Sequence, residues 1–176
     1  AKAMPIKSGM MTTIHAFTSD QRLVDTPHAD LRRARSATQS MIPTKTGAAQ
    51  SIGLVIPELE GKLDGYAMRV PTANVSVVDL TIQTETPIST DALHNLFQNA
   101  LANDPDLAHV LSLNQDPLVS IDFNHHPASA ILDQTQTRII TQGNESMIKL
   151  LAWYDNEWGF SNRMLDTAEY WLTKAA

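Results

Sequence analysis

The sequence predicts an α+β domain, built on a largely antiparallel mixed sheet that about three helices cover on one face. Two observations predict this class: several strand-like runs follow one another with few helices between them, and three stretches have helical periodicity. The chain has 176 residues, of which 43% are hydrophobic and 18% charged, as in an ordinary folded protein. We therefore expect residues 1–176 to form one domain with a substantial core.

The expected strands are short runs rich in apolar and β-branched residues. They cover residues 10–16, 66–70, 75–84, 118–123, 130–132, 135–140 and 147–154. In the run 75–84, valines alternate with polar residues, which indicates one buried face and one wetter face.

The expected helices are three. The first opens at Thr46 and Gly47, with Thr44 or Thr46 as its cap, and stops or bends at Pro57. The second is capped by Ser89 and ends near residues 103–105, and the third covers residues 159–173.

Residues 18–40 show no hydrophobic periodicity and contain many charged side chains, among them Asp20 and Arg33. A polar loop of this length is unusual in a compact domain and is often functional. The alternative is a solvated surface loop without a functional role.

Composition argues against several classes of partner. The net charge of -6 gives no reason to expect nucleic acid or an anionic membrane. The sequence holds no apolar run near the ~20 residues of a membrane span. The chain has no cysteine, so disulfides and thiolate metal sites are excluded. An intracellular, cytoplasmic enzyme is the default expectation for such a chain.

Three segments concentrate residues that carry chemistry. Residues 11–18 read MTTIHAFT, residues 68–80 read MRVPTANVSVVDL, and residues 153–163 read WYDNEWGFSNR. In this order and spacing they resemble the catalytic half of the phosphorylating glyceraldehyde-3-phosphate dehydrogenases. The resemblance runs from about residue 9 to 172. It implies an NAD-dependent oxidation of glyceraldehyde 3-phosphate, with inorganic phosphate as the second substrate and 1,3-bisphosphoglycerate as the product.

His15 is the first candidate for catalysis. A histidine titrates near neutral pH, so it can accept a proton or, as a cation, lower the pKa of a neighbouring thiol. A single histidine in an apolar strand is more often a core residue, but the segment around His15 resembles the general-base motif of the family. The pair His125 and His126 suggests no metal site, because adjacent residues of a strand point to opposite faces.

The resemblance also implies two phosphate sites. Thr18 and Arg69 match the positions that hold the phosphate of the substrate, with Asp20 as an orienting group. Thr46 and Gly47 match the positions that hold inorganic phosphate, where a helix N-terminus supplies amide donors. Arg33 is a weaker candidate for this second site, since a surface arginine cluster is often only solvated.

Asn156 matches the asparagine that orients the nicotinamide ring, and its amide offers both a donor and an acceptor. Phe160 stands where many relatives carry tyrosine. Asp155, Glu157 and Arg163 are expected to pair with one another and to cap the last helix.

The nucleophilic cysteine and the glycine-rich NAD-binding segment of this family have no counterpart in residues 1–176. We therefore expect the NAD-binding domain and the nucleophile to lie upstream of this chain, and the chain alone to be inactive. Two alternatives stay open: a domain of erythrose-4-phosphate dehydrogenase, and a non-catalytic assembly or interaction domain. The strands carry more apolar surface than three helices can cover, and the related enzymes are tetramers, so a homotetramer is expected.

Overall fold

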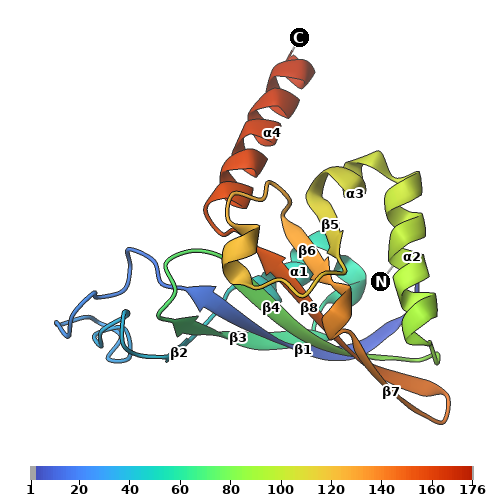
Figure 1. Cartoon of the computed structure of the whole chain (residues 1–176), viewed down its shortest axis with the longest axis horizontal. Coiled ribbons are helices and arrows are strands. Elements are labelled where there is room, and N and C mark those ends of the chain that lie inside the picture. The colour runs from blue at the N-terminus through green and yellow to red at the C-terminus, as the bar shows by residue number, and fades with distance from the viewer. Residues whose placement is uncertain (1–2, 176) are drawn as a thin grey trace.

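The computed structural model describes residues 3–175; the side chains of residues 48–50 and 175 lie outside this description. Four α-helices and eight strands form an α+β domain around a single mixed sheet (Figure 1). The elements are β1 (Ile6–Ala16), β2 (Ile42–Thr44), α1 (Ala48–Val55), η1 (Pro57–Leu59), β3 (Leu63–Val70), β4 (Ser76–Thr84), α2 (Thr90–Asn103), α3 (Pro105–Val110), β5 (Leu111–Asn114), η2 (Ser120–Phe123), β6 (Ala130–Asp133), η3 (Gln134–Gln136), β7 (Arg138–Gln142), β8 (Glu145–Tyr154) and α4 (Trp158–Ala175).

The sheet has the strand order β2-β3-β1-β4-β8-β6-β5, and β7 pairs with β8. Two pairs, β1 with β3 and β5 with β6, are parallel, while the other pairs are antiparallel. The predicted fold class is therefore confirmed. None of the helices within residues 3–175 combines the length and hydrophobicity that crossing a membrane requires.

Gly65 allows the parallel pair β1 and β3 to come close. A Cβ atom at this position would lie 2.1 Å from the carbonyl oxygen of Met11, so a side chain has no room. The pairing sets His15 opposite Arg69 in the register of the two strands.

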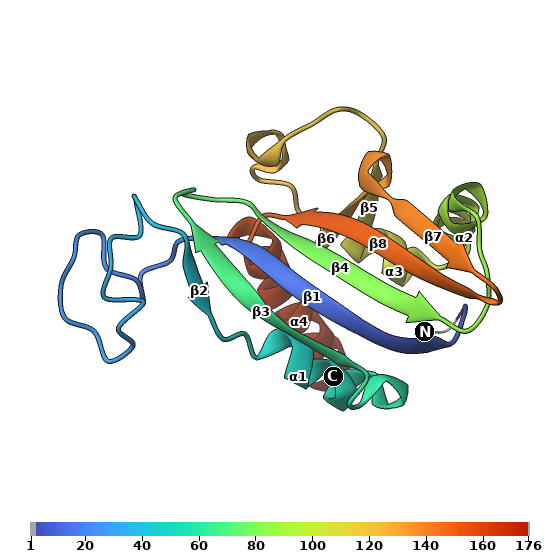
Figure 2. The same ribbon diagram turned by 90° about the horizontal axis from the view of Figure 1, so that it is seen from below.

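The helices lie on one side of the sheet. Ile82, Leu93 and Ile148 form a buried cluster between β4, β8 and α2, and Phe97 and Leu150 pack against it. The view from below meets β2, β3, β1, β4 and β8 with no helix in front of them (Figure 2). One broad face of the sheet is thus left open in this chain.

Several boundaries differ from the expectation. The strand expected at residues 118–123 is the 3-10 helix η2, where the Asp122 carboxylate accepts a hydrogen bond from the Val119 amide and only Phe123 is buried. The strand expected at residues 135–140 starts at Arg138, because Asp133 caps the short helix η3 first.

The N-cap residue of α1 is Gly47, next to the expected cap Thr46. The Ser89 hydroxyl accepts a hydrogen bond from the Ala92 amide at the start of α2, as predicted. The short elements β2, α3 and β5 were not anticipated.

Candidate functional site

The predicted catalytic residues gather where four strands meet at one end of the sheet. Strands β1, β3 and β8 end there and β4 begins there, at the end near the long 18–41 loop (Figure 2). His15 faces Arg69 across β1 and β3, and Ser76 faces Tyr154 across β4 and β8. Residues far apart in the sequence are thereby brought onto one edge.

His15 is half-buried between two side chains. Its Nδ1 atom lies 2.6 Å from the carbonyl oxygen of Ala16, and the Tyr154 ring meets the imidazole edge-on with 6.0 Å between centroids. So short a distance to a carbonyl oxygen places the proton on Nδ1, which leaves the Nε2 lone pair to accept a proton. Burial, together with the nearby Arg69 cation, lowers the pKa of His15, although the bond to Ala16 opposes the shift. The imidazole is therefore neutral near neutral pH, in the form that can accept a proton.

Arg69 joins His15 to Thr18. Its Nη1 atom lies 3.1 Å from Nδ1 of His15 and donates to the Ala16 carbonyl and the Thr18 hydroxyl, each at 3.1 Å. The buried Nε atom of Arg69 has no hydrogen-bond partner. Burial and the neighbouring Arg33 cation lower the pKa of Arg69. A guanidinium this poorly compensated is an attractive neighbour for an anion.

Arg33 reaches the same end of the sheet from the long loop. Its Nε and Nη2 atoms donate to the Thr44 hydroxyl at 3.1 and 2.7 Å, and its Nη1 atom pairs with the Asp20 carboxylate. Asp20 therefore holds Arg33 in place, whereas the sequence suggested that it orients Thr18 and Arg69.

Thr46 and Gly47 lie apart from the His15 and Arg69 pair. They follow β2 and line a cavity of ≈ 430 Å³ together with Arg32, Lys45 and Tyr66. The cavity carries two cationic side chains beside the start of α1. Its chemistry suits a small anion.

Asn156 follows β8 and faces a second cavity. This cavity has a volume of ≈ 310 Å³, and its lining includes His15, Tyr154, Phe160 and Arg163. The arrangement places an amide side chain and the imidazole of His15 on one small cavity.

Asp155 fixes the turn that carries Asn156. Its carboxylate accepts hydrogen bonds from the amides of Glu157 and Trp158 at the start of α4, and from Asn74 and the His125 amide. Although burial favours the neutral acid, these hydrogen bonds hold the pKa of Asp155 below its usual value. The predicted cap of the last helix is confirmed for Asp155.

The expected pairing of Arg163 with this turn is wrong. Arg163 instead pairs with Asp166 one turn further along α4, with 2.8 Å between Nε and the carboxylate. Among residues 3–175, no group of three or more potential metal ligands lies together, so the structure adds no metal candidate.

Comparison with known proteins shows the family of this chain. Residues 1–156 match the family described as glyceraldehyde 3-phosphate dehydrogenase, C-terminal domain. The chain belongs to the glyceraldehyde-3-phosphate dehydrogenase family. It is 56% identical over 167 residues to a glyceraldehyde-3-phosphate dehydrogenase of Pseudomonas aeruginosa, an alignment that covers 95% of this chain and 48% of the relative.

Other bacterial members of the family are similar. A plasmid-encoded glyceraldehyde-3-phosphate dehydrogenase of Cupriavidus necator is 55% identical, with 93% of this chain and 47% of the relative covered. Glyceraldehyde-3-phosphate dehydrogenase 2 of Staphylococcus aureus is 51% identical, with 93% and 46% covered. The chain thus spans about half the length of these relatives.

Sequence reasoning missed several residues that support this candidate site. Ser76 and Asn74 hold the side chains of Asn156 and Asp155, and Tyr154 packs against His15. The sequence held a signal for these residues, because the polar Asn74 and Ser76 flank Val75 at the point where a strand was expected to begin.

Proposed function

We propose that this chain is the catalytic domain of an NAD-dependent phosphorylating glyceraldehyde-3-phosphate dehydrogenase. The observation that carries the proposal is the cluster of His15, Arg69 and Thr18 at one end of the sheet, where a base lies directly beside an anion site. The names of the relatives support the substrate, since each is called a glyceraldehyde-3-phosphate dehydrogenase. In this proposal the NAD-binding domain and the nucleophilic cysteine belong to the part of the protein outside this chain.

His15 is the general base. The cysteine thiolate adds to the aldehyde carbon, and the resulting hemithioacetal carries a hydroxyl group. Nε2 of His15 accepts the hydroxyl proton as the carbon loses hydride, so that a thioester forms. NAD supplies the hydride acceptor when it is bound. Phosphate then attacks the thioester and releases an acyl phosphate and the thiolate.

Arg69 and Thr18 hold the phosphate group of the substrate. Phosphate offers only acceptor oxygens and negative charge, and a guanidinium with a neighbouring hydroxyl matches both. Their contact with each other at 3.1 Å and the unpartnered Nε of Arg69 support this role. The aldehyde end of the substrate then reaches the base on the neighbouring strand.

Thr46 and Gly47 serve the attacking inorganic phosphate, with Arg33 as a weaker participant. The separate cationic cavity that they line with Arg32 and Lys45 supports two distinct phosphate sites. Two sites are what the reaction needs, because the substrate phosphate and the attacking phosphate are present together.

Asn156 contacts the carboxamide of the nicotinamide ring. It faces the same cavity as His15, so a ring bound there would lie within reach of the carbon that loses hydride. The residues of this half therefore fit the nicotinamide end of NAD.

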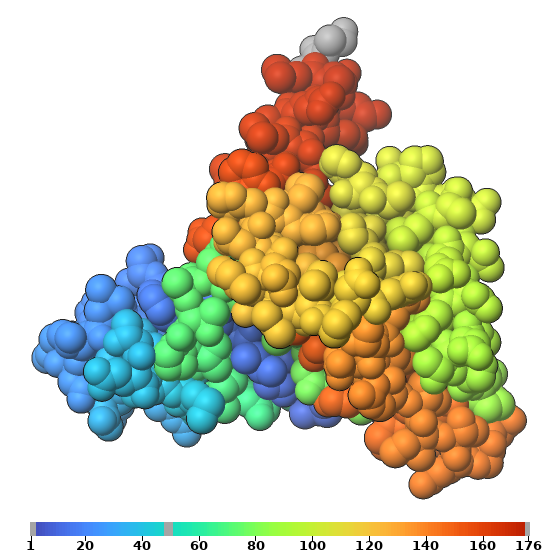
Figure 3. Space-filling model, viewed as in Figure 1, coloured from blue at the N-terminus to red at the C-terminus, as the bar shows by residue number. Residues whose placement is uncertain are grey.

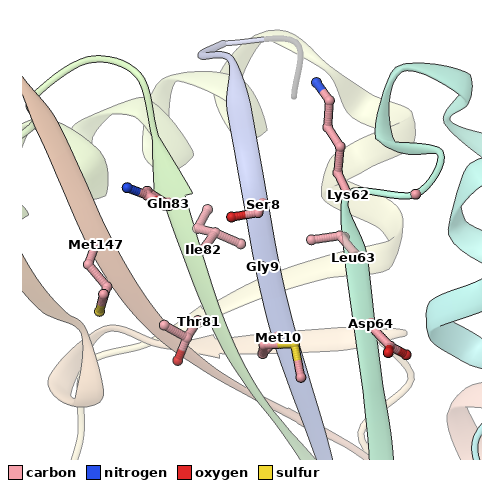
Figure 4. A pocket seen from close by; sticks show the side chains of 11 residues that line it. Ser8, Gly9, Met10, Lys62, Leu63, Asp64, Thr81, Ile82, Gln83 and Met147 are labelled. Atoms are coloured by element: carbon pink, nitrogen blue, oxygen red, sulfur yellow. The ribbon is translucent and has the colours of Figure 1, made fainter.

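The parent protein is a homotetramer that packs the open face of the sheet against a copy. Met10, Tyr66, Met147 and Ile140 lie on that face, each at least 46% exposed. A hollow of ≈ 380 Å³ lies on this face, beside Met10, Thr81 and Met147 (Figure 4). Large apolar side chains gathered on an open face are typical of an interface.

One experiment tests the proposed activity. The full-length protein, including its upstream half, is assayed for NADH formation from glyceraldehyde 3-phosphate with and without inorganic phosphate. We expect NADH formation that depends on phosphate and acyl phosphate as the product. Faster turnover of erythrose 4-phosphate, or no NADH formation from either sugar phosphate, would contradict the assignment.

A further inference from the structure

Ser76 is almost fully buried, at 1% exposure, yet it holds the residue that faces the coenzyme in the proposed function. We propose that Ser76 is a positioning residue, which fixes the side-chain amide of Asn156 in a single orientation at the cavity that Asn156 shares with His15. This inference rests on the proposed function. It adds a specific residue and a direction of hydrogen bonding to it.

The hydrogen bonds of the Ser76 hydroxyl define its role. Oγ accepts a bond from the Ala16 amide at 3.1 Å. A backbone N–H only donates, so the hydroxyl proton of Ser76 is left to be given elsewhere. It goes to Oδ1 of Asn156, at 2.7 Å.

The other end of the Asn156 amide has a different neighbour. Nδ2 donates to the Glu157 carboxylate at 3.4 Å. An ionised carboxylate can only accept, so it demands the amide nitrogen on its side. Ser76 and Glu157 thus select the same orientation of Asn156 from opposite ends.

The consequence concerns what Asn156 can recognise. Its oxygen accepts one hydrogen bond from Ser76 and its nitrogen donates one to Glu157, so each end keeps one further site, a lone pair and an N–H, for a ligand. Asn156 therefore meets the carboxamide of the nicotinamide, which carries both a donor and an acceptor, in a fixed orientation. The sequence alone did not fix this orientation.

The backbone before Ser76 shows how the fold places it. Val75 is buried and has φ of 66°, which is a costly conformation for a β-branched residue. On one side of Val75, Asn74 donates to the Asp155 carboxylate at 2.9 Å, and on the other Ser76 donates to Asn156. The strained turn thereby directs two side chains onto two successive residues of the site.

Tyr154 borders the same hydroxyl. It faces Ser76 across the sheet, and burial raises the pKa of its phenol, against the opposing influence of Ser76. The Ser76 hydroxyl therefore lies among Ala16, Asn156 and Tyr154 at one end of the sheet.

The test is a double-mutant cycle in the full-length enzyme, with the Kd and KM for NAD as readouts. We expect Ser76→Ala to raise both about 3- to 10-fold, as the loss of one positioned hydrogen bond does. Asn156→Ala should raise them at least as much. Adding Ser76→Ala to Asn156→Ala should then change the Kd for NAD by less than about 2-fold, because Ser76 acts through Asn156.

A matched control comes from the opposite end of the same sheet. Ser146 in β8 is also fully buried, and its hydroxyl accepts a bond from the Ile88 amide at 3.1 Å. Ser146→Ala should lower the melting temperature as Ser76→Ala does but leave the Kd for NAD unchanged. Additive effects of the Ser76 and Asn156 substitutions, or an unchanged Kd in Ser76→Ala, would overturn the inference. Failure of the proposed function itself would show separately, as absence of NADH formation in the unsubstituted enzyme.

Discussion

The guanidinium of Arg69 lies 3.1 Å from Nδ1 of His15, so the anion site and the base touch each other. Both residues end neighbouring parallel strands, which makes the contact a result of strand register. The Arg69 cation disfavours a second proton on His15 and helps to keep the imidazole neutral, in the form that can accept a proton. Arg69 therefore has two effects, one on a bound anion and one on the pKa of His15, and the two can be measured separately.

The first prediction is a pH profile. Because burial and Arg69 lower the pKa of His15, the acid limb of kcat/KM should lie below the ordinary histidine value of 6.5. Arg69→Gln should move this limb to higher pH, since it removes the cation. The pH profiles should be measured with unphosphorylated glyceraldehyde, because this substrate carries no phosphate group for Arg69 to bind.

An NMR titration of the His15 imidazole checks the same shift directly, with the exposed Arg138→Gln as the control. The folded-state pKa lies below the unfolded value, so His15 should make folding less stable as the pH falls below about 6.5. An imidazole that titrates at or above its ordinary value would contradict the structural reading.

The second prediction concerns the base itself. His15→Asn in the full-length enzyme should lower kcat by ~10²–10⁴-fold, the usual contribution of a positioned acid-base group. Rapid-mixing experiments should show slow hydride transfer, while thioester phosphorolysis is affected less. His94→Asn, on α2, is the control and should keep normal turnover. A near-normal rate in His15→Asn would remove it from catalysis.

The third prediction tests whether Arg69 binds the phosphate group of the substrate or acts on its aldehyde group. Arg69→Ala should lower kcat/KM for glyceraldehyde 3-phosphate by about 10- to 100-fold, as expected for a lost charged hydrogen bond. Use of unphosphorylated glyceraldehyde at a pH where His15 is neutral should change far less. Steady-state kinetics with both aldehydes provide the measurement. An equal loss on both would show that Arg69 does not bind the phosphate group.

Much of the catalytic edge could be predicted from the sequence, because its residues sit in short, ordered motifs. His15 was predicted as a base and Thr18 with Arg69 as a phosphate site, and the structure joins the three through Nη1 of Arg69. Sequence patterns also predicted the long strands, where side chains alternate between a buried and a wetter face. Asp155 was anticipated as the cap of α4, and its amide contacts confirm this role.

The features that could not be predicted from the sequence depend mostly on contacts between residues far apart in the chain. Ser76 carries no chemical signature of its own, and its role depends on Ala16 and Asn156, which are 60 and 80 residues away. The segment around Phe123 looked like a strand because of its apolar residues, but local hydrogen bonds turn it into a 3-10 helix. The short helix α3 had a readable signal in Asp104 followed by Pro105, a capping residue before a proline.

The fourth prediction concerns the attacking phosphate. Thr46→Ala should raise the apparent KM for inorganic phosphate about 3- to 10-fold, the effect of one lost hydrogen bond. The KM for glyceraldehyde 3-phosphate should stay within about 2-fold in this variant. Thr38→Ala, in the exposed loop, is a control that should leave both constants unchanged. A rise in the KM for the sugar phosphate alone would place Thr46 in the other site.

The last prediction concerns assembly through the open face of the sheet. Met147 is 52% exposed and pairs with Ile140 on the adjacent strand β7, and both lie on the face of the sheet that no helix within residues 3–175 covers (Figure 2). The β7 segment, in orange, forms a projecting corner of the molecule (Figure 3). Met147→Lys in the full-length protein should weaken a tetramer built on this face, because burying an unpaired ammonium costs several kcal/mol. Asn99→Lys, on an exposed position of α2, adds the same charge away from the face and should leave assembly intact. Light scattering at micromolar concentration measures the mass of each variant. A tetramer that persists unchanged in Met147→Lys, or an unsubstituted protein that is a monomer, would show that this face is not the interface.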